Sequence, residues 1–386
     1  MSAANMNLRK WVSNDPELMR KWEKEDFEIH PHKINDSNET LKILGISWDT
    51  NEDSLSIDTD SLMEFLKNKR NTKRFILKTA GKIFDPFGLI TPFTVRLKFL
   101  LQELWVRKLT WDDELPTDIC QEWAKWCCEC HHLSKIAVPR FILNPEADST
   151  EIHCFSDASQ RVYGTVVYIK LRKQEEISVS FFASKCRVAP VKRITLLRLE
   201  LLGALLAARL GSGVKKLLDQ KKSSRIFYWT DAKIVLCWIK GTSTKWKSFI
   251  ANRVNEIRKL TQPTEWFYCS TKENPADVMT RGVQIDFLVN CSKWWSCCDF
   301  LTCSEIPHQD LSIEVVEENP QVRRYGVLTL EEIKDAEVYI LLEAQKSEFL
   351  EEINQLKRVF AHTQTICIVY VENLYSNIST KCDQYM

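Results

Sequence analysis

Four acidic residues in the middle of the chain have the types and spacing of a metal-binding cluster. Two of them end short runs that predict strands, and ligands bind at the carboxyl ends of strands in open α/β sheets. A third interrupts a leucine-rich helical run, where an unpaired acid is costly. The fourth lies near the start of a short helix, whose dipole favours a negative charge. In chain order these residues are Asp157, Glu200, Asp231 and Asp277.

Carboxylates that converge on one point repel one another unless cations neutralise them. Hard oxygen ligands of this kind suit Mg²⁺ or Mn²⁺. Two such ions side by side can stabilise the attacking water and the leaving oxygen in phosphodiester hydrolysis. Each acid taken alone could instead be a helix cap or a solvated charge. Their order and placement together favour a shared metal site.

The elements around these acids alternate between strands and helices. This order predicts an α/β fold, with a mixed five-stranded sheet and flanking helices. The strands are predicted over residues 152–157, 163–171, 177–184, 225–230 and 264–269, and the helices over 194–210, 232–240 and 245–260.

The chain before residue 150 is predicted to be mainly helical. A short helix follows the turn at Asp15, and a strand over 41–49 pairs with one over 54–57 as a small hairpin. Three longer helices are predicted over residues 72–84, 92–109 and 118–133. After the sheet, residues 322–360 predict two acidic amphipathic helices, and the segment 361–386 is irregular.

The net charge of +1 conceals an uneven distribution. Residues 152–282 contain 24 Lys and Arg against 10 Asp and Glu, a net charge of +14, and the rest of the chain carries −13. A basic module within an acidic frame suggests a polyanionic partner, and nucleic-acid phosphate is the obvious candidate. Chance clustering of solvated charge is the alternative.

Basic residues beside two of the predicted helices are candidate contacts to a phosphate backbone. One group precedes the helix that carries Glu200, and the other belongs to the basic helix over 245–260. A solvated basic face is the alternative for both groups. The candidates are Arg187, Lys192, Arg193, Lys245, Lys247 and Arg253.

The 14 cysteines are expected to be reduced thiols, because they cluster in a long chain without a secretory signal. Two Cys- and His-containing segments, 120–132 and 291–308, could be read as zinc sites. Neither has paired C-x-x-C spacing at both ends, so buried thiols beside tryptophans are the favoured interpretation.

No run of about 18 uncharged apolar residues occurs, and the N-terminus lacks a signal-peptide pattern. We therefore expect an intracellular protein, cytoplasmic or nuclear, that is soluble and has no membrane partner.

Several motifs in order resemble the ribonuclease H domain of BEL/Pao-type LTR retrotransposon polyproteins. They surround each of the four acids. The motifs are Phe155-Ser156-Asp157-Ala158-Ser159, Arg198-Leu199-Glu200-Leu201-Leu202-Gly203-Ala204, Trp229-Thr230-Asp231, and Glu273-Asn274-Pro275-Ala276-Asp277 with Arg281-Gly282.

The resemblance implies a ribonuclease H-like sheet and a specific reaction. The four acids would hold two Mg²⁺ (or Mn²⁺) ions, with Asp157 bridging both. A metal-activated water would then attack the phosphorus in line and cut the RNA strand of an RNA–DNA hybrid.

The flanks resemble other parts of the same polyprotein. Residues 8–14 and 44–49 are similar to the end of its reverse transcriptase palm. Residues 72–74, 83–89 and 111–112 are similar to its thumb and connection. The expected domains are a palm remnant with a hairpin (1–66), a helical thumb and connection (67–148), a ribonuclease H-like domain (150–285), a helical lead-in to integrase (286–360) and an irregular tail (361–386).

Several departures from the family pattern limit the expected activities. No Tyr-x-Asp-Asp motif and no integrase His/Cys pattern occur, so neither the polymerase nor the integrase site is complete in this chain. Leu197, Ala232 and the pair Met279-Thr280 replace residues common in the family without removing an acid. No histidine occurs between residues 265 and 282, so a His-assisted step is not expected.

Two functions are consistent with these residues. The first is a ribonuclease H-type endonuclease that uses Mg²⁺ or Mn²⁺ and takes an RNA–DNA hybrid as its partner. The second is a catalytically silent or domesticated retroelement fragment that binds nucleic acid. The remainder of a Pol polyprotein is a further partner that the resemblance allows.

Overall fold

The computed structural model of the protein describes residues 11–29, 41–43, 46–192, 194–241 and 246–303. The chain divides into two units, 1–311 and 312–386, and all described residues belong to the first. The helices predicted over 322–360, the lead-in to integrase beyond residue 303 and the tail 361–386 lie outside the described residues. So do two candidate phosphate contacts, Arg193 and Lys245.

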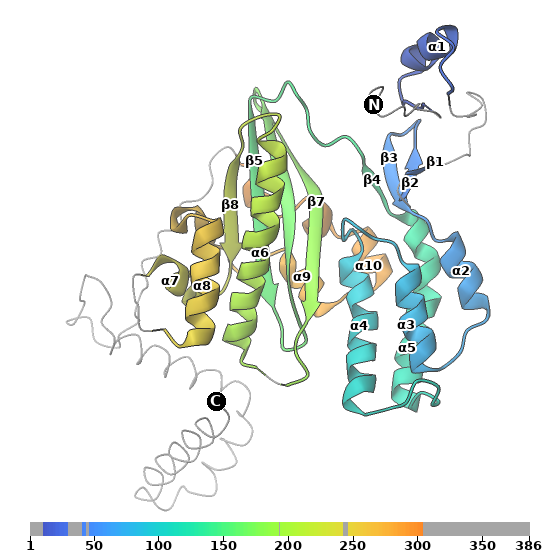
Figure 1. Cartoon of the computed structure of the whole chain (residues 1–386), viewed down its shortest axis with the longest axis vertical. Helices are drawn as coiled ribbons and strands as arrows, with labels where there is room; N and C mark the ends of the chain where they lie inside the picture. The colour runs from blue at the N-terminus through green and yellow to red at the C-terminus, as the bar shows by residue number, and fades with distance from the viewer. Residues whose placement is uncertain (1–10, 30–40, 44–45, 193, 242–245, 304–386) are drawn as a thin grey trace, which may run out of the picture. The chain divides into compact units, whose positions relative to one another are not determined.

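A mixed five-stranded sheet forms the centre of the second half of the described chain (Figure 1). Its order is β7-β6-β5-β8-β9. The first three strands in sequence pair antiparallel, whereas β8 runs parallel to β5, and β9 parallel to β8. This arrangement is the predicted ribonuclease H-like sheet. The strands are β5 (Ser149–Ala158), β6 (Val162–Lys173), β7 (Glu176–Val188), β8 (Arg225–Thr230) and β9 (Trp266–Tyr268).

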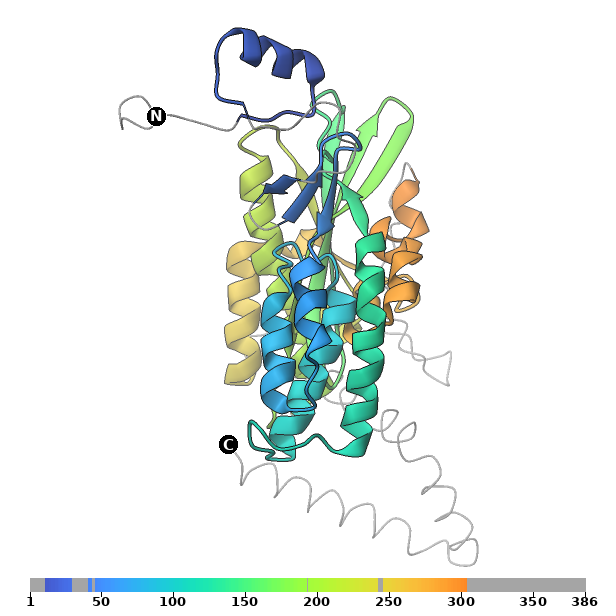
Figure 2. The ribbon, with the colours of Figure 1, turned by 90° about the vertical axis from the view of Figure 1, so that its right-hand side faces the viewer.

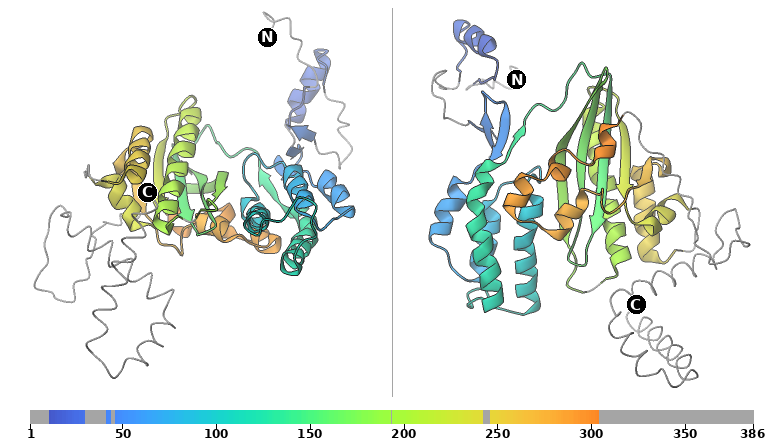
Figure 3. Two further views of the ribbon diagram at one scale, coloured as in Figure 1. Left: turned by 60° about the horizontal axis from the view of Figure 1, so that its bottom comes forward. Right: turned by 180° about the vertical axis from the view of Figure 1, so that it is seen from behind.

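Helices cover both faces of this sheet. The leucine- and alanine-rich α6 (Leu196–Leu218) packs with α8 (Ser248–Leu260) on one face (Figure 1). The α7 helix (Lys233–Lys240) lies beside β8 and β9. The opposite face is seen in the right-hand panel of Figure 3. It carries α9 (Ala276–Arg281), α11 (Ser292–Trp295) and η4 (Asp299–Thr302), whereas α10 (Ile285–Val289) contacts the helical region.

The first part of the chain contains helices and a second sheet. α1 (Pro16–Lys24) begins where predicted, because the side chain of Asp15 accepts hydrogen bonds from its first turn. Figure 2 shows α3, α4 and α5 running alongside one another. The α2 helix was not predicted. The helices are α2 (Asp60–Lys67), α3 (Lys73–Lys82), α4 (Thr91–Val106) and α5 (Thr117–Glu129), followed by η2 (Cys130–Lys135).

The predicted hairpin is part of a four-stranded antiparallel sheet. The single strand expected over 41–49 is wrong: β1 (Leu41–Ile43) and β2 (Ile46–Asp49) are separate strands that pair antiparallel, so the chain reverses between them. Apolar alternation looks the same on both sides of such a reversal, so the pattern could not reveal it. β3 (Ser54–Ile57) continues the sheet, and β4 (Ala137–Pro139) joins it from beyond the helices.

One hydrophobic core runs from the helical region into the larger sheet. It joins Phe93 and Trp126 of the helices with Phe155 and Trp229 of the strands. The edge strand β7 is also covered, because the amide of Ser184 donates to the carbonyl of Phe87 at 2.8 Å. The predicted boundary between a thumb and a ribonuclease H-like domain stays a prediction, since the two regions pack together. Within the described residues, no helix is long and apolar enough to cross a membrane.

Candidate metal centre

Three of the four predicted acids meet at one edge of the larger sheet. Asp157, Glu200 and Asp231 each offer a carboxylate oxygen, and these oxygens lie within 4.8 Å of one another. Asp157 and Glu200 are buried, with 5% and 8% of their surface exposed, and Asp231 is half-buried. Among the residues that the structure describes, no other group of three or more His, Cys, Asp or Glu side chains is placed to hold a metal ion.

The strand register explains why two of these acids are neighbours. β5 and β8 run parallel, and Ser156 lies opposite Thr230. The next residue on each strand is an acid, so Asp157 and Asp231 leave adjacent strands side by side. This is the carboxyl edge where open α/β sheets bind ligands.

Glu200 reaches the cluster because α6 lies close to β5. Gly203 is one turn further along the helix, and a Cβ atom there would lie 3.1 Å from the carbonyl oxygen of Asp157. A larger residue would require the helix or the strand to shift by a few tenths of an ångström. The small residue therefore lets α6 bring Glu200 over the strand end.

The acids shift each other's proton affinity. Burial and the charge of Asp231 raise the pKa of Asp157 to about 7. Burial and the charge of Asp157 raise the pKa of Glu200 well above its ordinary value, and burial raises that of Asp231. Each shift has the direction expected for crowded buried carboxylates without a counter-charge. A divalent cation would remove the repulsion.

Two oxygen atoms in the cluster test whether a metal ion fits. Glu200 Oε2 and Asp231 Oδ1 are buried and have no hydrogen-bond partner. Buried polar atoms are normally paired, so these two need an explanation. Carboxylate oxygens are the ligands that Mg²⁺ and Mn²⁺ prefer. The donor set therefore fits such an ion.

The fourth predicted acid, Asp277, lies outside this group of three. It occupies the first turn of α9, and its Oδ1 accepts a hydrogen bond from Arg281 Nε at 2.7 Å. Its charge still reaches the cluster. After burial and the charge of Asp231, the charge of Asp277 further raises the pKa of Asp157.

Three polar side chains of the segment 271–280 support the cluster, and sequence analysis did not assign them. Thr280 donates to Asp157 Oδ2, and Thr271 donates to Asp231 Oδ2 at 2.7 Å. The buried Asn274 donates to the carbonyl of Ser156 at 2.9 Å. Asn274 belongs to a motif that resembled the family, so its importance could have been inferred. Thr280 was read as a departure from the family and carried no such signal.

The candidate phosphate contacts lie apart from one another along the chain. Arg187 on β7, Lys192 after it and Lys247 before α8 are exposed. Arg253 is half-buried, with its guanidinium 3.9 Å from the centre of the Phe249 ring. That contact is a cation–π interaction within α8. Their role at a nucleic-acid backbone stays a prediction.

The cysteines of the described residues are free thiols. Cys130 of segment 120–132 and Cys297 of segment 291–308 are buried, and burial raises the pKa of each thiol. Among the residues that the structure describes, neither segment has a group of side chains placed to hold a metal ion. His308, at the end of the second segment, lies outside the described residues.

The comparison with known families identifies the domain. The fold and the acidic cluster define a ribonuclease H-like domain. Residues 72–232 match the family model described as the Pao retrotransposon-like RNaseH-like domain. The match includes Asp157, Glu200 and Asp231, together with α3, α4 and α5 of the helical region.

Solved structures with a similar arrangement are distant in sequence. A foamy viral protease–reverse transcriptase in complex with double-stranded DNA is 12% identical over 61% of this chain, with a TM-score of 0.36, and the match spans 38% of that chain. RNase H1 of Halobacterium salinarum is 12% identical over 33% of this chain and 89% of its own, with a TM-score of 0.23. LC11-RNase H1 with an RNA/DNA hybrid is 8% identical over 36% of this chain and 99% of its own, also at 0.23. A search of curated proteins found no match.

Proposed function

We propose that this protein is a ribonuclease H-type endonuclease that hydrolyses the RNA strand of RNA–DNA hybrids. The observation that carries the proposal is the convergence of Asp157, Glu200 and Asp231, with two buried carboxylate oxygens left without partners. The match of residues 72–232 to the Pao retrotransposon-like RNaseH-like domain supports the choice of substrate. The proposal concerns this domain within a Pol polyprotein.

The four acids would hold Mg²⁺ or Mn²⁺. Bound there, such ions supply a metal-activated water and neutralise charge on the phosphate. Asp157 would be the central ligand, because Glu200 of α6 and Asp231 after β8 both lie near it. Asp277 would complete the set by exchanging its ion pair with Arg281 for a place at the centre.

Threonine hydroxyl groups orient two of the carboxylates. Thr280 and Thr271 each bind the Oδ2 atom of one aspartate, and the Oδ1 atom of Asp231 is buried without a partner. Hydrogen bonds of this kind fix a ligand's orientation before the metal arrives. The chain therefore contributes a largely preorganised donor set.

The substrate would be held by positive charge around the site. The net charge of +14 over residues 152–282 favours a phosphate backbone. We assign the backbone contacts to the basic residues named from the sequence: Arg187, Lys192, Arg193, Lys245, Lys247 and Arg253. Hybrid selectivity rests on the family relationship.

A second function is favoured by one observation. Asp277 is paired with Arg281 and stands apart from the other three acids. A fragment that had lost metal-dependent cleavage could still bind nucleic acid through its basic residues. Under this alternative the protein is a catalytically silent nucleic-acid-binding module.

A cleavage assay with two variants separates the two functions. The wild-type protein with Mg²⁺ should cut a labelled RNA–DNA hybrid, and Asp157→Asn should reduce the rate by on the order of 10³-fold, because a metal ligand supports several kcal/mol of transition-state stabilisation. Glu176→Gln is the matched control, since Glu176 is an exposed carboxylate at the other end of the sheet. Equal cutting by wild type and Asp157→Asn contradicts the assignment. Hybrid binding without cutting by the wild type supports the silent module.

A further inference from the structure

The turn that follows α9 is packed against the helical region. Gly282 has a φ angle of +73°, a conformation that favours glycine. A Cβ atom at this position would lie 3.2 Å from Arg96 Cγ and Phe99 Cε2, both on α4. The amide of Val283 also donates to the carbonyl of Pro92 at 2.9 Å. The end of α9 is therefore seated directly on α4.

A largely buried ion pair makes hydrogen bonds to the backbone of the same turn. Arg96 of α4 and Glu129 of α5 make two hydrogen bonds of 2.6 and 2.9 Å, and their side chains are only 15% and 12% exposed. Arg96 also donates to the carbonyl of Val283 at 3.4 Å, and Glu129 accepts from the amide of Ile285 at 3.2 Å. Both partners of the pair thus bind the backbone of the turn.

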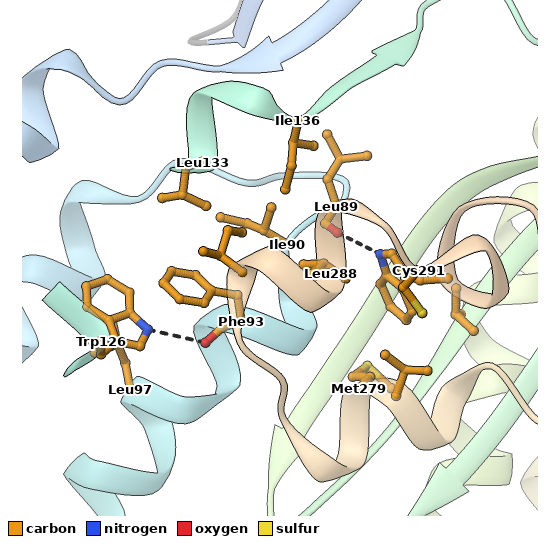
Figure 4. Packing of buried hydrophobic residues seen from close by; sticks show 14 of the residues in the cluster. Leu89, Ile90, Phe93, Leu97, Trp126, Leu133, Ile136, Met279, Leu288 and Cys291 are labelled. Carbon is orange, nitrogen blue, oxygen red and sulfur yellow. Dashed lines mark hydrogen bonds between the residues drawn. The ribbon is translucent and has the colours of Figure 1, made fainter. Parts of the chain in front are cut away.

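Apolar packing holds the body of α9 in the same place. Met279 is fully buried and belongs to the core that contains Leu89, Ile90 and Phe93 (Figure 4). On its other side, a Cβ atom at Gly164 of β6 would lie 2.3 Å from Met279 Cε. α9 is therefore clamped between α4 and the sheet.

The clamped helix carries Thr280, which binds the acidic cluster, and Asp277, which is proposed to complete it. Thr280 donates to Asp157, and Ser159 donates to the carbonyl of Thr280 at 3.2 Å. Asp277 stands one turn earlier on the same helix. A shift of α9 would move both Thr280 and Asp277 relative to Asp157.

We propose that the Arg96–Glu129 ion pair positions α9, and through it Thr280 and Asp277, at the metal centre. Arg96 and Glu129 are positioning residues that touch neither the metal ligands nor the substrate. The proposal rests on the proposed function of the acidic cluster. Under this proposal the helical region contributes to the nuclease site, because it holds the turn after α9 and thereby places Thr280 and Asp277.

Hydrogen exchange of the metal-free protein tests the anchoring directly. Arg96→Met should speed exchange of the amides in residues 276–285 by about tenfold, since local opening no longer has to break the ion pair. Exchange in β5 and β6 should stay at the wild-type rate. Arg96→Lys, which keeps the charge but loses the paired geometry, should give an intermediate effect.

Arg74→Met is the matched control variant. Arg74 makes a similar two-bond pair with Asp112, at 2.7 Å for each bond, on α3 of the same helical region. This pair is exposed and has no bond to α9. Its loss should leave exchange in residues 276–285 unchanged.

Metal binding gives the functional readout without requiring cleavage. The dissociation constant for Mn²⁺ can be measured from the electron paramagnetic resonance signal of the unbound ion. It should rise by about tenfold in Arg96→Met, as for other groups that orient metal ligands. It should be unchanged in Arg74→Met. Hybrid cleavage at saturating Mn²⁺ should then recover in Arg96→Met, because the ligands themselves are intact.

The outcomes separate this proposal from the proposed function. If Arg96→Met and Arg74→Met behave alike in exchange and in Mn²⁺ affinity, the positioning role is overturned while the nuclease assignment stands. If the wild type neither binds Mn²⁺ nor cuts the hybrid, the proposed function fails. Hydrogen exchange in residues 276–285 still shows whether the Arg96–Glu129 pair anchors α9. Faster exchange spread evenly over the sheet would show general destabilisation and would also overturn the proposal. Glu129→Gln provides the same test from the other partner if Arg96→Met does not fold.

Discussion

The strand β5 carries a buried charged cluster at each end, and the two clusters are built in opposite ways. Near its start, Glu151 lies opposite Lys170 on β6 and opposite Arg225 on β8. His153 also faces it, with Nε2 3.3 Å from Glu151 Oε2. Near the end of the strand, Asp157 meets the acids Glu200 and Asp231 and the neutral hydroxyl of Thr280, and no basic side chain of the described residues pairs with it. The strand thus has one compensated and one uncompensated cluster.

The pKa values of the two acids record this difference. Burial raises the pKa of Glu151, but His153, Lys170 and Arg225 more than offset it and lower the pKa to about 2. Burial and the charge of Asp231 raise the pKa of Asp157 to about 7. The two acids are about equally buried, at 6% and 5% exposure. The comparison teaches that burial alone does not mark a functional acid, whereas burial among like charges does.

The largest expected contrast is in the stability of the metal-free protein. Glu151→Gln should lower the free energy of unfolding by about 3–5 kcal/mol, because Lys170 loses its buried counter-charge. Asp157→Asn should raise it by about 4 kcal/mol at pH 8, because a repelled charge disappears. Urea unfolding in the presence of a chelator measures both. Destabilisation of similar size in the two variants would remove the distinction between the clusters.

The pH dependence of stability should also have opposite signs at the two ends. Asp157 has its pKa raised from 3.8 to about 7. Its contribution to the free energy of unfolding is therefore complete below pH 3.8 and is lost as the pH rises through 7. The loss amounts to about 4 kcal/mol. Glu151 has its pKa lowered from 4.5 to about 2, so its contribution is present above 4.5 and is lost as the pH falls through 2.

In the absence of metal, the free energy of unfolding should therefore fall as the pH rises from 4 to 8. The fall should be of the order of the loss given for Asp157. The slope should become smaller in Asp157→Asn, where Glu200 and Asp231 with their raised pKa values still contribute, and it should persist in full in Glu151→Gln. Millimolar Mg²⁺ should remove it in the wild type, because the cation binds the ionised acids. An unchanged slope in Asp157→Asn would assign it to other groups.

The smallest expected effect concerns the hydrogen bond from Thr280 to Asp157 in the uncompensated cluster. Thr280→Val removes the hydroxyl that donates to Asp157. The pKa of Asp157 should rise further, and the affinity for Mn²⁺ should fall by about tenfold. Thr280→Ser keeps the hydroxyl and serves as the control. Titration of both variants with Mn²⁺ checks the prediction, and equal affinities would show that the hydroxyl does not orient the ligand.

Local sequence patterns predicted much of the sheet and of the cluster. The runs that became β5 and β8 each end in an acid, and parallel neighbours bring such ends together. Glu200 was identified because an acid is costly in a leucine-rich helix. The pairing of Asp277 with Arg281 was not predicted, although their spacing of four residues on a helix is typical of an ion pair.

Other features depended on contacts that no local pattern carries. The reversal between β1 and β2 is hidden by the alternation on both sides of it. β4 joins its sheet from about eighty residues further along the chain, because edge pairing depends on where the helices deliver the strand. The hydroxyl of Thr280 meets Asp157 only because α9 folds back over the sheet.

By itself, the sequence determined which acids could form a cluster and which strands would carry them, because periodicity and residue chemistry act over short distances. The tertiary structure alone decided that three acids converge while Asp277 pairs with Arg281. It also decided that Arg96 of the helical region holds the turn after α9, across a separation of 187 residues. Such contacts depend on how preformed elements pack, and packing is a property of the whole core rather than of any segment.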